Sequence, residues 1–329
     1  MRAQHFAAEL HRLGPAEDED RWAPPSEDEN LNFETVTLAG LLRETLPRRE
    51  LILAPIIPVR GLAMLFAGRG TGKTHVGMGM GYAIASGATF LRWHAARPRR
   101  VLYVDGEMPQ EALQERARSL AAATPYSPPD ESYFTILPMD RQKLGVSINL
   151  SKPEHQAALE RHLDGVEFMV IDNISTLVNG GRENDADSWD AMQAWLLQLR
   201  RRGVSVLLIH HAGRGDNARG TSKREDVLDT VIQLKRPEDY DMEEGARFEV
   251  HLTKARGVVG DDAQPFEAKL NVVDGVDSWT CQVLRDRELD RVAELSGEGM
   301  SVRDIGTELN LSKSKIQRMQ AKLRAEGRL

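Results

Sequence analysis

The sequence is short of cysteine, of aromatic residues and of long apolar runs. Its single cysteine, Cys281, cannot form a disulfide within the chain. Aromatic residues make up only 5% of the chain, and the N-terminus lacks the apolar stretch of a secretory signal. Apolar runs such as Gly203–Ile209 and Phe168–Ile171 fall far short of the roughly 18–20 residues that cross a bilayer. We therefore expect a cytosolic protein without membrane contact.

What is present fits a folded chain whose charge differs along its length. The 329 residues are 41% hydrophobic and 28% charged, which is enough for a large α/β domain with a small appendage. The formal net charge is −7, yet the two ends differ in sign. Acidic residues crowd between Glu17 and Glu29 around Pro24-Pro25, which predicts a solvated, disordered arm over residues 1–32.

From about Phe33, short apolar runs alternate with amphipathic stretches, a pattern typical of βαβ units on a parallel sheet. The predicted strands are Ala63–Ala67, Val101–Asp105, Phe134–Leu137, Phe168–Asp172 and Val204–His210. The predicted helices are Thr74–Ala85, Pro109–Ala122 and Ser188–Arg200, the last with a core face of Trp189, Met192, Trp195, Leu196 and Leu199. Further on, Arg247–Lys254 and Pro265–Val273 predict a hairpin across Gly257–Gln264. The large domain thus spans residues 33–283.

A glycine-rich segment follows the first of these strands and opens a helix. It reads Ala67-Gly68-Arg69-Gly70-Thr71-Gly72-Lys73-Thr74 and is followed by His75. In a phosphate-binding loop, backbone N–H groups and the positive end of the helix surround the anion. Lys73 would reach the β- and γ-phosphates of ATP, and the Thr74 hydroxyl would bind Mg²⁺. The segment from Gly68 to His75 therefore predicts the ATP site of a P-loop ATPase.

Acidic residues follow two later strands. Asp172 ends an apolar strand, so its carboxylate is expected beside the phosphate loop, where it would hold Mg²⁺. Asp105 and Glu107 follow the strand after the phosphate-loop helix, a placement that resembles the RecA-like branch of P-loop ATPases. Glu107 is the predicted catalytic base that orients the attacking water, and Asp105 is the alternative, favoured instead as a turn or capping residue.

Two adjacent histidines, His210 and His211, end the next strand. Neighbouring residues on a strand point to opposite faces, so both are not expected to contact one ligand. In RecA-like motors a polar residue at this position senses the γ-phosphate. His211 is the predicted sensor, and a structural role is the alternative.

Together these motifs resemble the RepA-like hexameric helicases of plasmids and mobile elements, within the RecA/DnaB-type ATPases. The resemblance covers about 51–270 and includes Val101–Met108, Val170–Leu177, His210–Gly213 and Arg219–Ser222. It implies a RecA-like fold and a homo-hexameric ring in which ATP lies between subunits.

In such rings the neighbouring subunit supplies cationic fingers to the γ-phosphate. Lys254 and Arg256, at the end of a predicted strand, resemble the Lys-x-Arg finger pair of DnaB-type helicases. A strand with alternating polarity would put both side chains on one face, as two cooperating fingers require. The alternative is an ordinary solvated pair on an edge strand. Arg219 is a further candidate finger or loop anchor. The resemblance also implies DNA-binding loops toward the pore, at Asn179–Asp187 and Gly213–Arg224, the second with the candidate contacts Arg214, Arg219, Lys223 and Arg224.

Residues 284–329 predict a small helix-turn-helix domain. Ser301 and Ser312 are expected to cap its second and third helices, and its predicted core is Ile305, Leu309, Leu311, Ile316, Met319 and Leu323. From Ser312 to Leu329 there are six basic residues and one acidic residue. Candidate DNA contacts on the third helix are Lys313, Lys315 and Arg318. The alternative is a protein-interaction module whose basic face is only solvated.

The sequence therefore predicts a ring-forming ATPase that acts on DNA during replication of a plasmid, phage or integrated element. Two rival hypotheses remain. One is a DNA-binding regulator in which ATP controls assembly, and the other is a loader or scaffold that recruits a second replication protein, suggested by the acidic arm.

Overall fold

The computed structural model describes residues 33–46, 49–178, 186–213, 223–273, 276–284 and 287–329. The chain divides into two compact units, Met1–Arg48 and Arg49–Leu329, so the predicted boundary at Phe33 lies within the first unit. In the first unit helix α2, Leu38–Arg43, begins where the Thr37 hydroxyl accepts a hydrogen bond from the Gly40 N–H, at 3.0 Å. None of the residues of α2 is buried.

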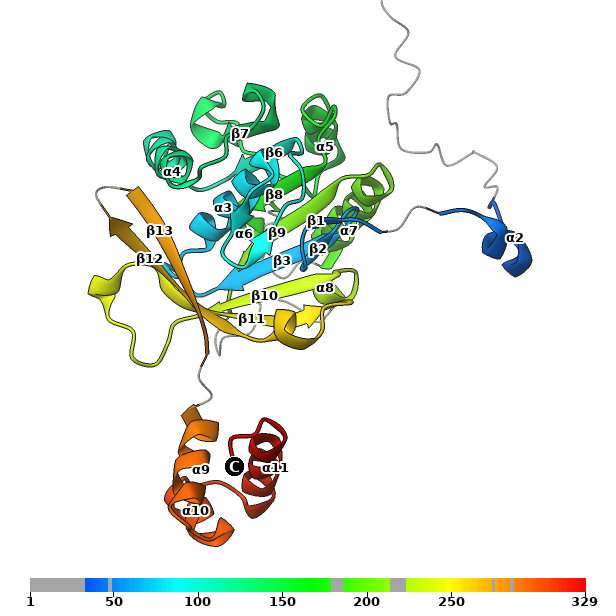
Figure 1. Ribbon diagram of the computed structural model, residues 1–329. Coiled ribbons are helices and arrows are strands. Elements are labelled where there is room, and N and C mark those ends of the chain that lie inside the picture. Colours follow the sequence, from blue (N-terminus) through cyan, green and yellow to red (C-terminus); the bar gives the residue numbers. More distant parts are fainter. Residues whose placement is uncertain (1–32, 47–48, 179–185, 214–222, 274–275, 285–286) are drawn as a thin grey trace, which may run out of the picture. The chain divides into compact units, whose positions relative to one another are not determined.

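The second unit contains a nine-stranded sheet in the order β13-β12-β11-β10-β3-β9-β8-β6-β7 (Figure 1). Six of these strands, from β10 to β7, run parallel. They are β3 (Leu62–Ala67), β6 (Val101–Asp105), β7 (Phe134–Pro138), β8 (Phe168–Asp172), β9 (Ser205–His211) and β10 (Thr230–Lys235). The α/β fold with a mostly parallel central sheet, predicted from the alternating pattern, is confirmed.

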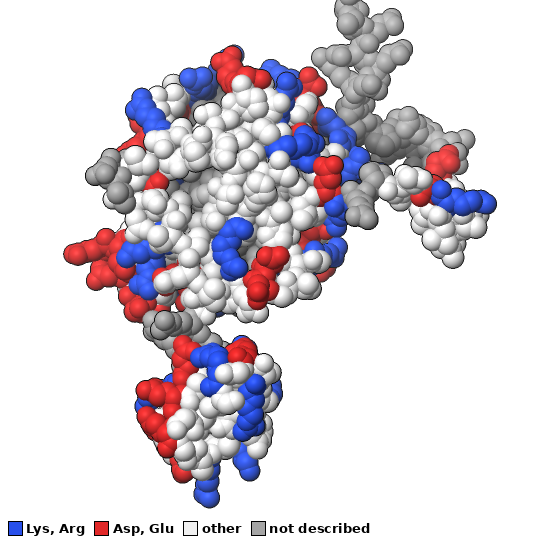
Figure 2. All heavy atoms as spheres, viewed as in Figure 1, with Lys and Arg blue, Asp and Glu red and all other residues white. Residues whose placement is uncertain are grey.

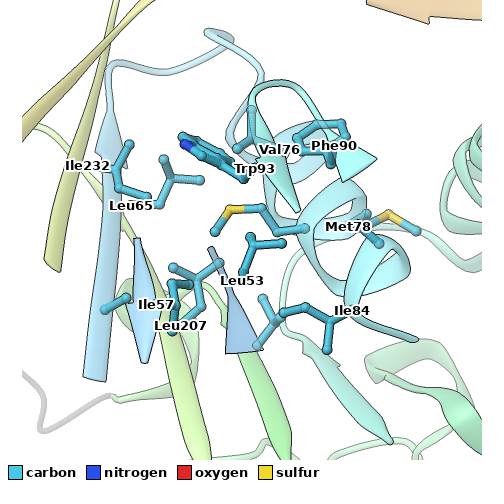
Figure 3. Packing of buried hydrophobic residues seen from close by; sticks show 14 of the residues in the cluster. Leu53, Ile57, Leu65, Val76, Met78, Ile84, Phe90, Trp93, Leu207 and Ile232 are labelled. Carbon is cyan, nitrogen blue, oxygen red and sulfur yellow. The ribbon is translucent and has the colours of Figure 1, made fainter. Parts of the chain in front are cut away.

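Helices cover both faces of this sheet because alternate residues of each strand point to opposite sides. On one face Leu65 packs in a core with α3 (Lys73–Ser86) and α4 (Gln110–Ala123), as Figure 3 shows for α3. On the other face Met64 packs in a second core, which lies under α5 (Pro153–Glu160), α6 (Ile174–Leu177) and α7 (Ala186–Arg201). The predicted core face of α7, including both tryptophans, is buried there.

Three glycines let α3 lie unusually close to its neighbours. A Cβ atom on Gly77 would stand 2.4 Å from Ile209, one on Gly79 would stand 2.2 Å from Phe90, and one on Gly81 would stand 2.9 Å from Phe134. Side chains cannot be accommodated at the first two distances without movement of the packed neighbours. The helix that begins at the phosphate loop is therefore fitted closely to what it covers.

An antiparallel extension continues the sheet beyond β10. The predicted hairpin is confirmed as β11 (Arg247–Ala255) and β12 (Phe266–Val273), and a strand that the sequence did not predict, β13 (Val276–Val283), pairs with β12. Trp279 anchors β13, with ring centroids 5.8 Å from Phe90 and 5.5 Å from Phe248. The strand was missed because most of its side chains are exposed or half-buried, so it carries only a weak apolar pattern.

The remaining elements of the described chain are short. They are strands β1 (Leu51–Leu53), β2 (Ile57–Pro58), β4 (Thr89–Phe90) and β5 (Trp93–His94), helix α8 (Lys223–Asp226), and the 3₁₀ turns η1 (Glu131–Tyr133), η2 (Met139–Arg141), η3 (Met242–Glu244) and η4 (Gly260–Ala263). Among the helices that the structure describes, none combines the length and apolar character needed to cross a bilayer.

Three helices with their own core end the chain. They are α9 (Arg287–Gly297), α10 (Val302–Glu308) and α11 (Lys313–Ala325). Ser301 and Ser312 cap α10 and α11 through their hydroxyls, as predicted. All six predicted core residues pack in this cluster, together with Leu289, Val292 and Leu295. In Figure 2, Lys and Arg side chains gather on the α11 side of this module and Asp and Glu side chains on the side of α9 and α10.

Candidate active site

Four parallel strands end at one edge of the sheet and bring the predicted site residues together. Asp105 pairs in register with Asp172, and Ala67 pairs with His211. Chain segments that leave these strand ends therefore meet above the carboxyl edge of the sheet, where ligands bind in open parallel sheets. The opposite, amino edge carries the residues that precede the strands.

The phosphate loop occupies this carboxyl edge between β3 and α3. Gly70 and Gly72 have φ angles of +71° and +108°, values that residues other than glycine rarely adopt. Gly68 is not among the glycines with a positive φ angle. Helix α3 begins at Lys73, one residue earlier than predicted. The loop and the positive end of the helix form the anion-binding arrangement that the sequence predicted.

Lys73 lies inside the loop that it is predicted to serve. Its ammonium group donates hydrogen bonds to the carbonyls of Gly68 at 2.7 Å and of Ala67 at 3.2 Å. Burial lowers the pKa of Lys73, and the nearby carboxylates of Asp172 and Glu107 act in the opposite direction. The amine is thus held among acceptors that a phosphate can replace.

Asp172 faces the start of α3 from the end of β8. It accepts hydrogen bonds from the Tyr103 hydroxyl, at 2.6 Å, and from the Thr74 side chain. Burial raises the pKa of Asp172, and these two hydrogen bonds oppose the rise. Among the described residues Asp172 forms no ion pair, although the charge of Lys73 is near enough to lower its pKa. A buried carboxylate of this kind, next to a threonine hydroxyl, fits Mg²⁺, which takes one or two protein oxygens together with phosphate oxygens and water. Thr74 and Asp172 would hold that ion, which would neutralise phosphate charge.

Asp105 and Glu107 behave differently although they are two residues apart. Asp105 is fully buried, and its Oδ1 accepts the N–H groups of Glu107 at 3.0 Å and Met108 at 2.7 Å. This is the turn-capping geometry expected for Asp105. Burial raises its pKa to about 6. The Glu107 side chain, by contrast, is 56% exposed, so its carboxylate is accessible to a water molecule.

The two histidines point to opposite faces of β9, as predicted. His211 Nε2 lies 3.3 Å from Asn173 Nδ2 and 3.7 Å from the Glu107 carboxylate, within the site. Burial lowers the pKa of His211, and the charge of Lys73 lowers it further. His210 instead lies 3.3 Å from the guanidinium of Arg224.

The structure adds residues that sequence reasoning missed. Asn173 donates a hydrogen bond to Glu107 at 2.5 Å and also approaches His211. Arg236, directly after β10, donates to the Gly70 carbonyl at 3.2 Å and stacks over Tyr240, 4.6 Å from the ring centroid. The partners of Asn173 and Arg236 come from distant segments, so the sequence does not indicate these contacts. The only signal in the sequence was that Asn173 directly follows Asp172.

Lys254 and Arg256 lie at the amino edge, away from the phosphate loop of their own chain. Lys254 is on β11, and Arg256 lies one residue past the end of that strand rather than on it. Both donate hydrogen bonds to the Asp226 carbonyl, at 3.4 and 3.3 Å, so the two cations converge as predicted even though the strand does not extend to Arg256. Lys254 pairs with Val231 on β10, and Val231 pairs with Met64 on β3. Met64 comes three residues before Ala67, where the phosphate loop begins, so about 10 Å of strand separates the level of Lys254 from the loop.

The other predicted contacts are dispersed. His75 lies on α3 near Arg116 and Asp277, and burial together with Arg116 lowers its pKa to about 4. The Arg224 guanidinium stacks over Trp189, 5.3 Å from the ring centroid. Lys223 begins α8.

Arg214 and Arg219, most of both predicted DNA loops and the acidic arm lie outside the described residues. On α11, Lys313 and Arg318 are exposed and Lys315 is half-buried.

The fold and the phosphate loop define a P-loop nucleoside triphosphatase with a RecA-like sheet. The chain belongs to the AAA_25 family, described as an AAA domain, whose model matches residues 27–217, more than half of its length. It is therefore a P-loop ATPase, which implies that it binds a nucleotide, typically with Mg²⁺.

No curated protein matches the chain. Among solved structures, a KaiC-like protein from the hyperthermophilic archaeon Pyrococcus horikoshii OT3 is similar, with 16% identity and a TM-score of 0.48 over 71% of this chain and 99% of that one.

Proposed function

We propose that this ATPase forms a ring in which a second copy completes each ATP site, and that it uses hydrolysis to act on DNA, as RepA-like helicases do. The observation that carries the proposal is the separation of Lys254 and Arg256 from their own phosphate loop. A cation pair at the amino edge cannot reach the carboxyl edge of the same sheet, but it can reach the site of a neighbouring copy. A homo-hexamer is the ring that the resemblance implies.

In this proposal each residue of the site has a distinct task. Glu107 orients and polarises the attacking water, and its exposed carboxylate supports that role. Lys73 exchanges its two loop carbonyls for phosphate oxygens as charge develops on them. His211 contacts the γ-phosphate from the end of β9. Lys254 and Arg256 of the neighbouring copy supply the remaining positive charge, so turnover depends on assembly.

DNA would be held in two ways. Single-stranded DNA would pass through the ring pore and contact basic loops that include Arg214, Arg219 and Lys223. Duplex DNA would meet the start of α11, where Lys313 and Arg318 are exposed to solvent. Arg224 is not included, because its guanidinium stacks over Trp189 and lies beside His210.

A second candidate function is an ATP-dependent DNA-binding regulator or replication loader without unwinding activity. The complete core and the one-sided basic surface of the C-terminal module support it, since such a module can read a duplex without a motor. Strong discrimination between duplex sequences, combined with turnover that ignores single-stranded DNA, would favour this function over the motor.

The test measures ATP turnover across a range of protein concentrations, with and without single-stranded DNA. We expect turnover per chain to rise with both. Lys73→Ala and Arg256→Ala should each abolish it, while the control Arg118→Ala, an exposed position on α4, should not.

Mixing the two inactive variants gives the sharpest result. Some junctions in a mixed ring would combine an intact phosphate loop with an intact Arg256, so part of the turnover should return. Absence of recovery from a mixed assembly, or full turnover by a monomer, would refute the shared site.

A further inference from the structure

Asn173 is the point at which three parts of the active site meet. It follows Asp172 directly and is 1% exposed. Its side-chain Nδ2 lies 2.5 Å from Glu107 Oε2 and 3.3 Å from His211 Nε2. Its Oδ1 accepts the Thr176 N–H at 3.3 Å and so caps helix α6. One amide therefore contacts the predicted base, the predicted sensor and the start of a helix.

The proton count at His211 makes two of these contacts dependent on each other. An amide NH₂ group only donates, so His211 Nε2 must act as acceptor in its contact with Asn173, and the ring must carry its proton on Nδ1. A phosphate oxygen only accepts, so a contact between Nε2 and a γ-phosphate requires the proton on Nε2 instead. The same nitrogen cannot serve Asn173 and the phosphate at once.

We propose that Asn173 is a positioning residue that couples the γ-phosphate, sensed by His211, to the orientation of Glu107. The inference rests on the proposed function, because it takes Glu107 as the base and His211 as the sensor. Without a phosphate the amide bridges the two side chains and fixes the carboxylate next to the imidazole. When Nε2 donates to a phosphate oxygen, the amide loses its histidine partner and reorients, and the carboxylate bonded to it moves as well.

Two substitutions separate the amide from the helix cap. Asn173→Ser keeps a good capping residue for α6 but is too short to reach Glu107. Asn173→Asp keeps the shape and the cap, but it places a second acceptor against the Glu107 carboxylate. We expect kcat to fall about 10- to 100-fold in the first variant, as for a displaced catalytic group, and further in the second.

The KM for ATP should stay within about threefold in both variants, because the Asn173 side chain bonds neither the phosphate loop nor the Asp172 carboxylate. Retained binding of a fluorescent ATP analogue checks that both variants fold. Asn271→Ser, on β12, is the matched control and should leave kcat unchanged. Wild-type kcat in Asn173→Ser would overturn the inference.

A double-mutant cycle tests the coupling itself. If the sensor acts on the base through Asn173, His211→Ala should lower kcat at least about fivefold less in the Asn173→Ser background than in the wild type. Equal losses in both backgrounds would overturn the coupling.

Glu107→Gln separates failure of this inference from failure of the proposed function. Full turnover in Glu107→Gln would refute the assigned base, and the inference with it. Loss of turnover in Glu107→Gln together with equal losses in the cycle would refute only the role of Asn173.

Discussion

Two aspartates at opposite edges of one sheet, Asp172 and Asp229, are buried to almost the same degree, at 4% and 1% exposure. Burial raises the pKa of both carboxyls. In Asp229 it is outweighed by hydrogen bonds from Arg49 and the Leu62 N–H and by the charge of Arg200, so the pKa falls below its usual value. In Asp172 the hydrogen bonds from the Tyr103 and Thr74 hydroxyls do not outweigh the effect of burial, and the pKa rises above its usual value.

The comparison separates two uses of a buried carboxylate. Asp229 sits directly before β10 with the arginines at 2.8 and 3.3 Å, so its charge is neutralised within the chain and serves the fold. Asp172 keeps a buried charge at the carboxyl edge beside Asp105 and Glu107, and the charge of Lys73 lowers the pKa of Asp172 too little to outweigh burial. That charge costs stability in the free protein and attracts a cation when a nucleotide binds.

The largest effect we expect is on turnover, from Asp172→Asn. Removing the charge would weaken the hold on the Mg²⁺ that neutralises phosphate charge, so kcat should fall by about 10²- to 10³-fold, the range for loss of one group that stabilises developing charge. The melting temperature should not fall, because an amide avoids the cost of a buried charge and the two hydroxyls can still hydrogen-bond to it. Turnover and thermal unfolding are measured on the same preparation.

Asp164→Asn, an exposed position, is the control for that substitution. A lowered melting temperature with normal turnover would reverse the roles that we assign to the two edges.

Asp229→Ala should have the opposite profile. It removes both arginine contacts and leaves the buried Leu62 N–H without its side-chain acceptor, 3.1 Å away, so we expect unfolding to be easier by about 2–4 kcal/mol. Urea titration at neutral pH measures this loss. Because the folded pKa is lowered, the contribution is present above the unfolded pKa, about 3.9, and is lost as the pH falls through the folded value. A change below 0.5 kcal/mol would contradict the structural role.

Asp105→Asn sharpens the comparison through pH. The folded pKa of Asp105, about 6, exceeds the unfolded value, so the folded state keeps its proton longer and stability falls as the pH rises from about 4 to about 6. Asparagine cannot ionise and keeps an oxygen for the Glu107 and Met108 N–H groups. Without nucleotide or Mg²⁺, the variant should gain roughly 2–3 kcal/mol over the wild type at pH 8 and almost nothing at pH 4. A gain that does not depend on pH would show that the charge is not its source.

The smallest effects belong to the arginines themselves. Arg49 is 51% exposed and Arg200 is 29% exposed at their side chains, so each replacement by alanine should cost only about 0.5–1 kcal/mol. Replacing both should cost more than the sum, because the second loss leaves Asp229 without a cationic partner among the described residues. Urea titrations of the wild type, the single variants and the double variant measure this difference, and simple additivity would mean that the two arginines act on Asp229 independently.

The sequence predicted the carboxyl edge well because that edge depends on local rules. A parallel strand that ends in Asp172, or a glycine-rich turn that ends in Lys73, fixes both the element and the side-chain position within a few residues. The opposite orientations of His210 and His211 followed from the alternation of side chains along a strand. The serines that cap the N-terminal ends of α10 and α11, Ser301 and Ser312, depend on equally local rules. Each hydroxyl accepts a hydrogen bond from the N–H group three residues later.

What escaped prediction depends on distant contacts. Asn173 meets Glu107 across 66 residues of sequence, and Arg236 meets Gly70 across 166, so no spacing in the sequence signals either pair. Strand β13 is held by Trp279 against rings from two other segments. Arg256 lies outside the strand because β11 ends at Ala255. The position of that end depends on the pairing of Ala255 with Thr230 of β10.

The glycines of α3 limit how this protein can evolve. Gly77 faces Ile209 of β9 and Gly79, two residues further on, faces Phe90 of β4, so the helix is packed closely on more than one side. A methyl group added at either position would collide with the packed side chain, and a change there requires Ile209 or Phe90 to shift or change as well. Because none of the residues of α3 is exposed, the helix behind the phosphate loop should vary little around its whole circumference in descendants of this chain.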